Sequence, residues 1–157
     1  MRRPKHVTAV SAEEAGPIFE GTDYPGRFPE RVKGRSKVLL GEAFGLTNFG
    51  VNLTRLKPGT QSALRHFHTA QDEFIYILDG EAVLITDSGE TALRAGMCAG
   101  FKAGIRDAHH LINRSRKDVV YLEIGDRSEG DETFYPDDDL HLPPTGSYTH
   151  RDGTPWK

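Results

Sequence analysis

Between residues 49 and 124, short apolar segments alternate with turn signals, and this pattern limits the folds open to the chain. Residues 49–56 alternate in polarity as a strand does and stop at a Lys-Pro-Gly turn. Residues 73–79 form an apolar run that ends at Asp-Gly, a favoured hairpin turn, so we expect residues 81–86 to be the partner strand. Short strands at this spacing predict an all-β sandwich or small barrel.

The length of 157 residues, 36% of them hydrophobic, fits one domain with a real core. We expect a single domain, residues 1–157, with a barrel core over about 38–125. A turn-rich N-terminal arm, residues 1–37, precedes it. The C-terminal tail, residues 126–157, carries an acidic run that we expect to be a solvated loop. Because the tail also holds aromatic residues, parts of it should dock on the barrel or on a second subunit.

A pair of histidines separated by one residue carries the clearest chemistry. Side chains alternate faces along a strand, so His66 and His68 should point the same way. Glu73 stands at the start of the next apolar run and can fold back to meet them. Two imidazoles and a carboxylate make half of a site for a divalent transition metal. A further ligand is available at His109 or His110.

These residues resemble the first sequence motif of the cupin family. That motif is a glycine, two histidines one residue apart, a glutamate and a second glycine. Here it reads Gly59, His66, His68, Glu73 and Gly80, with Gly59 one residue further upstream than usual.

The second cupin motif is matched less closely. It reads Gly96, Gly104, His109 and Asn113, with lysine where a proline is usual and a slightly long interval before the histidine. The resemblance extends over about residues 48–125.

The resemblance implies a cupin double-stranded β-helix, a jelly-roll-like barrel, with extended terminal segments. It also implies that His66, His68, Glu73 and His109 hold one divalent metal per subunit. Strand alternation separately favours His109 over His110, although a bulge or a slip of one residue would exchange them.

Three histidines and one carboxylate leave coordination positions open to water or substrate, which suits Mn, Fe, Ni or Zn. Because imidazole must be neutral to bind a metal, we expect the affinity to fall below about pH 6.

The predicted function is that of a metal-dependent enzyme acting on a small polar metabolite, with isomerase, epimerase or dioxygenase chemistry. Cupins similar to this one are often named sugar-phosphate isomerases, a name that rests on analogy of fold. A phosphate group calls for two or more inward basic side chains. Arg55 is the main candidate, although a surface ion pair is favoured for it, so the sequence argues against that substrate. No side chain in the motifs stands out as a nucleophile, so we expect metal-centred chemistry. A non-catalytic small-molecule-binding or sensing cupin is the alternative.

Composition limits the partners. The net charge of −3 and the pI near 6.2 argue against a nucleic-acid binder. No apolar stretch approaches the roughly 20 residues that span a bilayer, and the basic start lacks the apolar region of a secretory signal. With one cysteine, we expect a cytoplasmic protein. Aromatic residues in the terminal segments, and the resemblance to cupins that dimerise, predict a homodimer; these residues are Phe19, Phe28, Tyr135 and Trp156.

Overall fold

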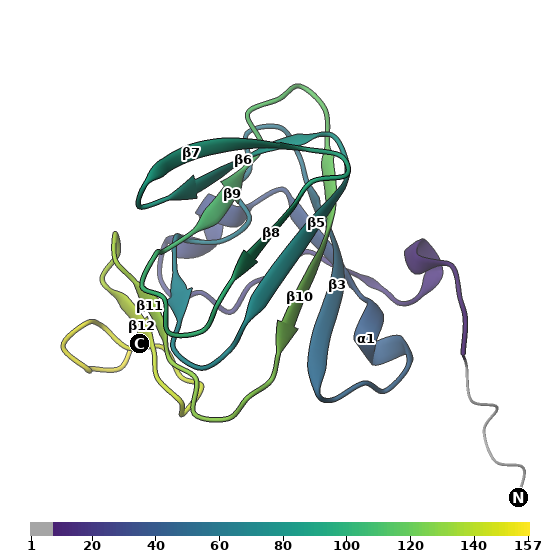
Figure 1. Ribbon diagram of the computed structural model, residues 1–157. Coiled ribbons are helices and arrows are strands. Elements are labelled where there is room, and N and C mark those ends of the chain that lie inside the picture. The colour runs from purple at the N-terminus through teal and green to yellow at the C-terminus, as the bar shows by residue number, and fades with distance from the viewer. Residues whose placement is uncertain (1–7) are drawn as a thin grey trace, which may run out of the picture.

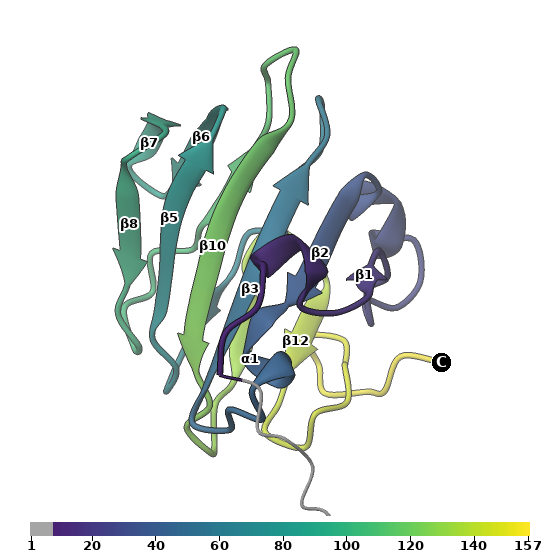
Figure 2. The same cartoon turned by 90° about the vertical axis from the view of Figure 1, so that its right-hand side faces the viewer.

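The computed structural model describes residues 8–157 as an almost entirely β-sheet fold. The largest sheet has the spatial order β1 (Ile18–Phe19), β2 (Arg35–Leu39), β3 (Phe49–Leu56), β10 (Val119–Asp126), β5 (Glu73–Asp79) and β8 (Cys98–Phe101). Figure 2 shows β8, β5, β10, β3 and β2 side by side in this sheet. A second sheet has the order β7 (Gly89–Arg94), β6 (Glu81–Thr86) and β9 (His110–Ile112). A third has the order β12 (Leu140–Leu142), β11 (Thr133–Tyr135) and β4 (Phe67–His68).

Helical structure in the described residues is confined to short turns. These are η1 (Ala12–Glu14), η2 (Phe28–Val32) and α1 (Leu40–Ala43). The predicted all-β, jelly-roll-like fold is therefore confirmed, although the sheets do not close into a continuous barrel. None of the helices in residues 8–157 is long and apolar enough to cross a membrane.

The core lies between the large sheet and the β7-β6-β9 sheet. Period-2 alternation places Ile75 and Ile77 of β5 inside, while Phe74, Tyr76 and Leu78 stay on the outer face. One cluster joins buried side chains of both sheets: Leu56, Ile75, Ile77, Val119 and Tyr121 on one side and Ala82, Leu84, Leu93 and Leu111 on the other. This apolar contact holds the two layers together.

The expected hairpin between residues 73–79 and 81–86 is wrong. Strand β5 pairs with β10 and β8, whereas β6 pairs with β7 and β9. The chain crosses from one sheet to the other at Gly80, whose φ is +82° and whose added Cβ would lie 2.5 Å from the carbonyl oxygen of Asp118. Because both strands are apolar on one face, packing them across the core buries more surface than pairing them side by side.

Both terminal segments contribute strands to the sheets. The segment before the barrel supplies β1, and the tail supplies β11, which pairs with β4, and β12. In Figure 1 the tail strands lie together near the C terminus. The first seven residues lie outside the described part of the chain, and with them the start of the predicted arm and the region where a secretory signal was not expected. The division into arm, core and tail remains a prediction.

Much of the tail is docked rather than solvated. Tyr135 and Leu140 pack with Leu64 in a second buried cluster, against which Tyr24, Phe28, Leu142, Tyr148 and Trp156 are half-buried. Arg65 forms ion pairs with Asp137 of the tail and with Asp87, which ties the tail to the loop after β6. The docking of tail aromatics is thus confirmed, whereas the acidic run is only partly solvated, since Asp131 and Asp138 are 10% and 11% exposed.

Candidate metal centre and cavity

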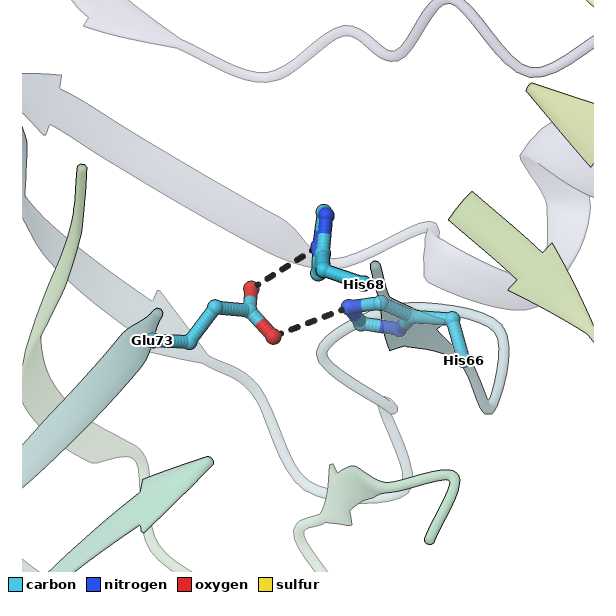
Figure 3. A group of neighbouring side chains, drawn as sticks. All are labelled: His66, His68 and Glu73. Carbon is cyan, nitrogen blue, oxygen red and sulfur yellow. Dashed lines mark ion pairs between the residues drawn. The ribbon is translucent and has the colours of Figure 1, made fainter. Parts of the chain in front are cut away.

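Three of the side chains singled out in the sequence meet inside the fold. His68 ends the short strand β4, His66 makes an antiparallel bridge to His109, and Glu73 opens β5. The Nε2 atoms of His66 and His68 lie 3.4 Å from Oε2 and Oε1 of Glu73, respectively (Figure 3). One ligand atom from each residue lies within 4.8 Å of the others, which is a spacing that one metal ion can bridge.

The outer nitrogens of both rings are held by acceptors. His66 Nδ1 lies 2.7 Å from the carbonyl oxygen of Leu64, and His68 Nδ1 lies 2.6 Å from Oδ2 of Asp131. A carbonyl or carboxylate oxygen only accepts, so each Nδ1 carries the proton. In the neutral rings the lone pairs are then on Nε2, facing Glu73. This is the arrangement that orients metal-ligating histidines in proteins, so the donor set fits a divalent ion.

The two candidates for the next ligand lie in different surroundings. His109 Nε2 is 2.7 Å from Oε2 of Glu73, and its ring centroid is 4.7 Å from that of His66. His110 Nδ1 instead lies 2.9 Å from the carbonyl oxygen of Ala63. The structure therefore brings His109, and not His110, to the carboxylate. Leu111 enters the core as alternation predicted, but His110 does not point away from the site: it is 9% exposed and lines the same cavity as His109.

Charge and burial shift the protonation of these groups. Burial alone would raise the pKa of Glu73, but hydrogen bonds to His109, His66 and His68 hold that pKa well below its usual range. Burial disfavours a charged His68, yet Glu73 and then Asp131 outweigh it and raise the pKa of His68 to about 9. Burial lowers the pKa of His109, despite its contact with Glu73.

The raised pKa of His68 changes the pH range expected for metal binding. In the metal-free protein His68 keeps a proton up to about pH 9, and a metal must displace that proton. We expect the apparent affinity to rise by up to about tenfold per pH unit from 7 to 9 and to level off above it. Calorimetric titration with Mn or Zn across this range measures the rise. An affinity that is constant from pH 7 to 9 and falls only below 6 would contradict it.

The raised pKa of His68 also makes the stability of the metal-free fold depend on pH. Because the folded-state pKa lies above the ordinary value of about 6.5, protonated His68 stabilises the fold fully below pH 6.5. That contribution is lost as the pH rises through about 9.

Two residues that support the site were missed in the sequence. Asp131, in the tail, bonds His68 and also accepts backbone N–H groups of Ala70 and Gln71 through Oδ1, at 2.8 and 3.1 Å. The ring of Phe101 on β8 stacks on His109, with centroids 3.5 Å apart. Neither has a local sequence signal, because each meets its histidine only through tertiary contact.

A cavity of about 400 Å³ lies beside the histidines, against the inner face of the large sheet. His66, Glu73 and His109 line one part of it, and a neighbouring cavity of about 320 Å³ reaches His68. Apolar side chains form much of the wall, among them Ile75, Leu84, Phe101 and Leu111. The site is thus a chamber suited to a small molecule.

The surface ion pair favoured for Arg55 is confirmed, whereas the expectation that few other basic residues face the chamber is wrong. Arg55 lies on the outer face, half-exposed, and pairs with Asp118. The cavity is instead lined by Arg35, Lys37 and Arg127. The argument against an anionic substrate therefore fails. Two of these residues were missed because strand β2 carries no distinctive pattern, and its inward face is decided by pairing with β3.

Comparison with known proteins agrees with this architecture. The cupin domain family model matches residues 52–125. A sugar phosphate isomerase from a cupin superfamily, from Silicibacter pomeroyi, is 40% identical over 90% of this chain and 92% of that chain, with a TM-score of 0.84. A provisionally named sugar phosphate isomerase from Acidithiobacillus ferrooxidans is 29% identical over 73% of this chain and 74% of that chain, with a TM-score of 0.69.

A more distant structure shares the fold alone. The polyketide cyclase RemF from Streptomyces resistomycificus is 17% identical over 76% of this chain and 79% of that chain, with a TM-score of 0.61. A search of curated proteins found no match. The 40% identity over nearly the whole of both chains, together with the match of the domain model, leads to one conclusion: this chain belongs to the cupin superfamily.

Proposed function

We propose that this protein is a divalent-metal-dependent enzyme of the isomerase or epimerase type that acts on a small, polar, anionic metabolite. One metal per subunit is held by His66, His68, Glu73 and His109. The observation that carries the proposal is the convergence of two Nε2 atoms on Glu73 while each Nδ1 is held by an acceptor. A bound Mn, Fe, Ni or Zn ion would supply Lewis-acid polarisation of a substrate oxygen.

The residues around the cavity favour an anionic substrate. Arg35 is 9% exposed, and its guanidinium donates to the carbonyl oxygens of Ser62 and Gly21, at 2.6 and 3.3 Å. Among residues 8–157, no carboxylate pairs with Arg35. A buried cation without a counter-charge is costly, and an anionic group of the substrate would offset that cost. The names of the two sugar phosphate isomerase relatives support the same class.

Metal reconstitution tests the proposal. The metal-free protein is loaded with Mn, Fe(II), Ni or Zn and offered aldose phosphates, keto acids and diketones, with O₂ uptake recorded. Isomerisation or epimerisation of a phosphorylated sugar by one metal form is the expected result. O₂ consumption with a keto acid or diketone would replace the proposal by a dioxygenase. Micromolar ligand binding without turnover in any metal form would make the protein a non-catalytic binder.

A homodimer remains our prediction, but its basis changes. Phe28, Tyr135 and Trp156 pack within the chain and no longer argue for a partner; the Phe28 and Trp156 rings are 5.7 Å apart. The outer face of β5 instead exposes Phe74, Tyr76 and Leu78, the kind of apolar patch that a second subunit covers. We expect light scattering to give twice the chain mass of 17.4 kDa. A mass near 17.4 kDa at micromolar concentration would exclude the dimer.

A further inference from the structure

Three polar side chains form a cluster on the inner face of the large sheet, beside the metal centre. Lys37 comes from β2, Asn52 from β3 and Glu123 from β10, and all three line the same cavity as His66, Glu73 and His109. The pairing of β3 with β10 brings two of its members together, because Asn52 lies directly opposite Glu123. Sequence separation hides it, since Lys37 and Glu123 are 86 positions apart.

The hydrogen bonds of this cluster leave groups free on its cavity side. Lys37 Nζ forms an ion pair with Oε1 of Glu123, and Asn52 Nδ2 donates to that same oxygen at 3.0 Å. Within residues 8–157, Oε2 of Glu123 has no hydrogen-bond partner, and Lys37 Nζ has no other. The Lys37 and Glu123 side chains are 19% and 24% exposed. An acceptor and a donor are therefore available to a molecule in the cavity.

The cluster lies next to the candidate metal centre, because Glu123 and Glu73 are on the neighbouring strands β10 and β5. Glu123 of β10 is opposite Ile75 of β5, and Gly125 is opposite Glu73. Glu123 and Glu73 are thus diagonal neighbours on adjacent strands, a separation of roughly 7–8 Å. Both side chains line the same cavity, so a small substrate with its oxygen at the histidines can place its next carbon near Glu123.

The core does not need an ion pair at this place. Removing two charges from water costs several kcal/mol per ion in typical proteins, and an apolar pair would often serve stability as well. Charged pairs in clefts are frequent at sites of chemistry. This pair lies at the cavity and next to the candidate metal ligands, so we expect it to take part in the reaction.

We propose that Glu123 and Lys37 are the proton-transfer residues of this enzyme, an inference that rests on the proposed isomerase function. Glu123 Oε2 removes the proton from the carbon next to the substrate carbonyl. The C–H electron pair becomes a carbon–carbon double bond, and the carbonyl oxygen takes a proton from Lys37. Neutral Lys37 then accepts the proton of the hydroxyl on the deprotonated carbon as the new carbonyl forms there, and Glu123 gives its proton to the former carbonyl carbon. Both residues end as they began, and no oxidant is needed.

The test uses the full chain loaded with Mn and D-ribose 5-phosphate or D-glucose 6-phosphate in D₂O. Product formation and deuterium on carbon are followed by NMR. Glu123→Gln, which keeps the shape of the side chain, is expected to lower both rates by about 10²–10⁴-fold, the usual worth of a general base. Its Mn affinity should stay that of the unchanged protein. Lys37→Gln should lower turnover in the same way.

The matched control is an exposed ion pair at the outer face of the same sheet, between Arg55 of β3 and Asp118, the residue before β10, which are 45% and 39% exposed. Arg55→Gln and Asp118→Asn should leave both rates unchanged. Turnover retained by Glu123→Gln, turnover without deuterium on carbon, or loss of folding or Mn affinity in both cavity variants would overturn the inference while the proposed function stands. If the unchanged protein turns over neither sugar phosphate in any metal form, the proposed function fails and this inference falls with it.

Discussion

Replacement of both His66 and His68 by alanine is expected to abolish metal binding. The two Nε2 atoms face Glu73 at 3.4 Å, and their loss leaves only Glu73 and His109 of the proposed ligand set. Four protein ligands supply a binding free energy of about 10–16 kcal/mol in structural zinc sites, so losing two removes roughly half of that free energy and weakens binding by about 10⁴–10⁶-fold. Calorimetric titration with Mn or Zn, and metal analysis of the purified variant, measure the loss.

The chain offers two histidines as a matched control. His141 pairs with Glu132 at 2.9 Å and His150 with Asp139 at 2.8 Å, both in the tail. The double variant His141→Ala, His150→Ala should bind metal as the unchanged protein does. Undiminished binding by a folded His66→Ala, His68→Ala variant would refute the ligand assignment.

Asp131→Asn is expected to lower metal affinity by about 10–100-fold, the usual cost of losing a carboxylate behind a metal-bound histidine. One oxygen of Asp131 holds His68 Nδ1 at 2.6 Å, and the other accepts two backbone N–H groups. An asparagine must point its NH₂ group at one of these donors. The ring of His68 then loses its orientation or the loop after β4 loses its anchor. Titration of the variant with Mn gives the affinity ratio.

An exposed aspartate–histidine pair serves as the comparison. Asp139 Oδ2 lies 2.8 Å from His150 Nδ1, in the same tail but away from the cavity. Asp139→Asn should leave metal affinity unchanged. If Asp131→Asn binds metal as tightly as Asp139→Asn, then Asp131 has no role in orienting His68.

Local pattern in the sequence was enough to locate the central strands and three of the site residues. Strands β3, β5 and β6 begin and end where residues 49–56, 73–79 and 81–86 indicated. Period-2 alternation and turn residues act within a few positions, so they can be read without knowing what packs against them. The spacing of His66, His68 and Glu73 is equally local, and it carried the family resemblance.

Tertiary structure decided which strands pair and which distant side chains complete the cavity. The segments on either side of Gly80 were expected to form a hairpin, yet they belong to different sheets because their apolar faces meet across the core. Asp131 reaches His68 only because the tail docks beside β4, and Lys37 meets Glu123 only through the order β2-β3-β10. Contacts between residues so far apart in the chain depend on how whole strands bury their apolar faces. No local pattern of residues indicates which strands will pair. The sequence alone therefore determined the strands and the histidine–glutamate core of the site. The packed fold determined which other side chains surround that core.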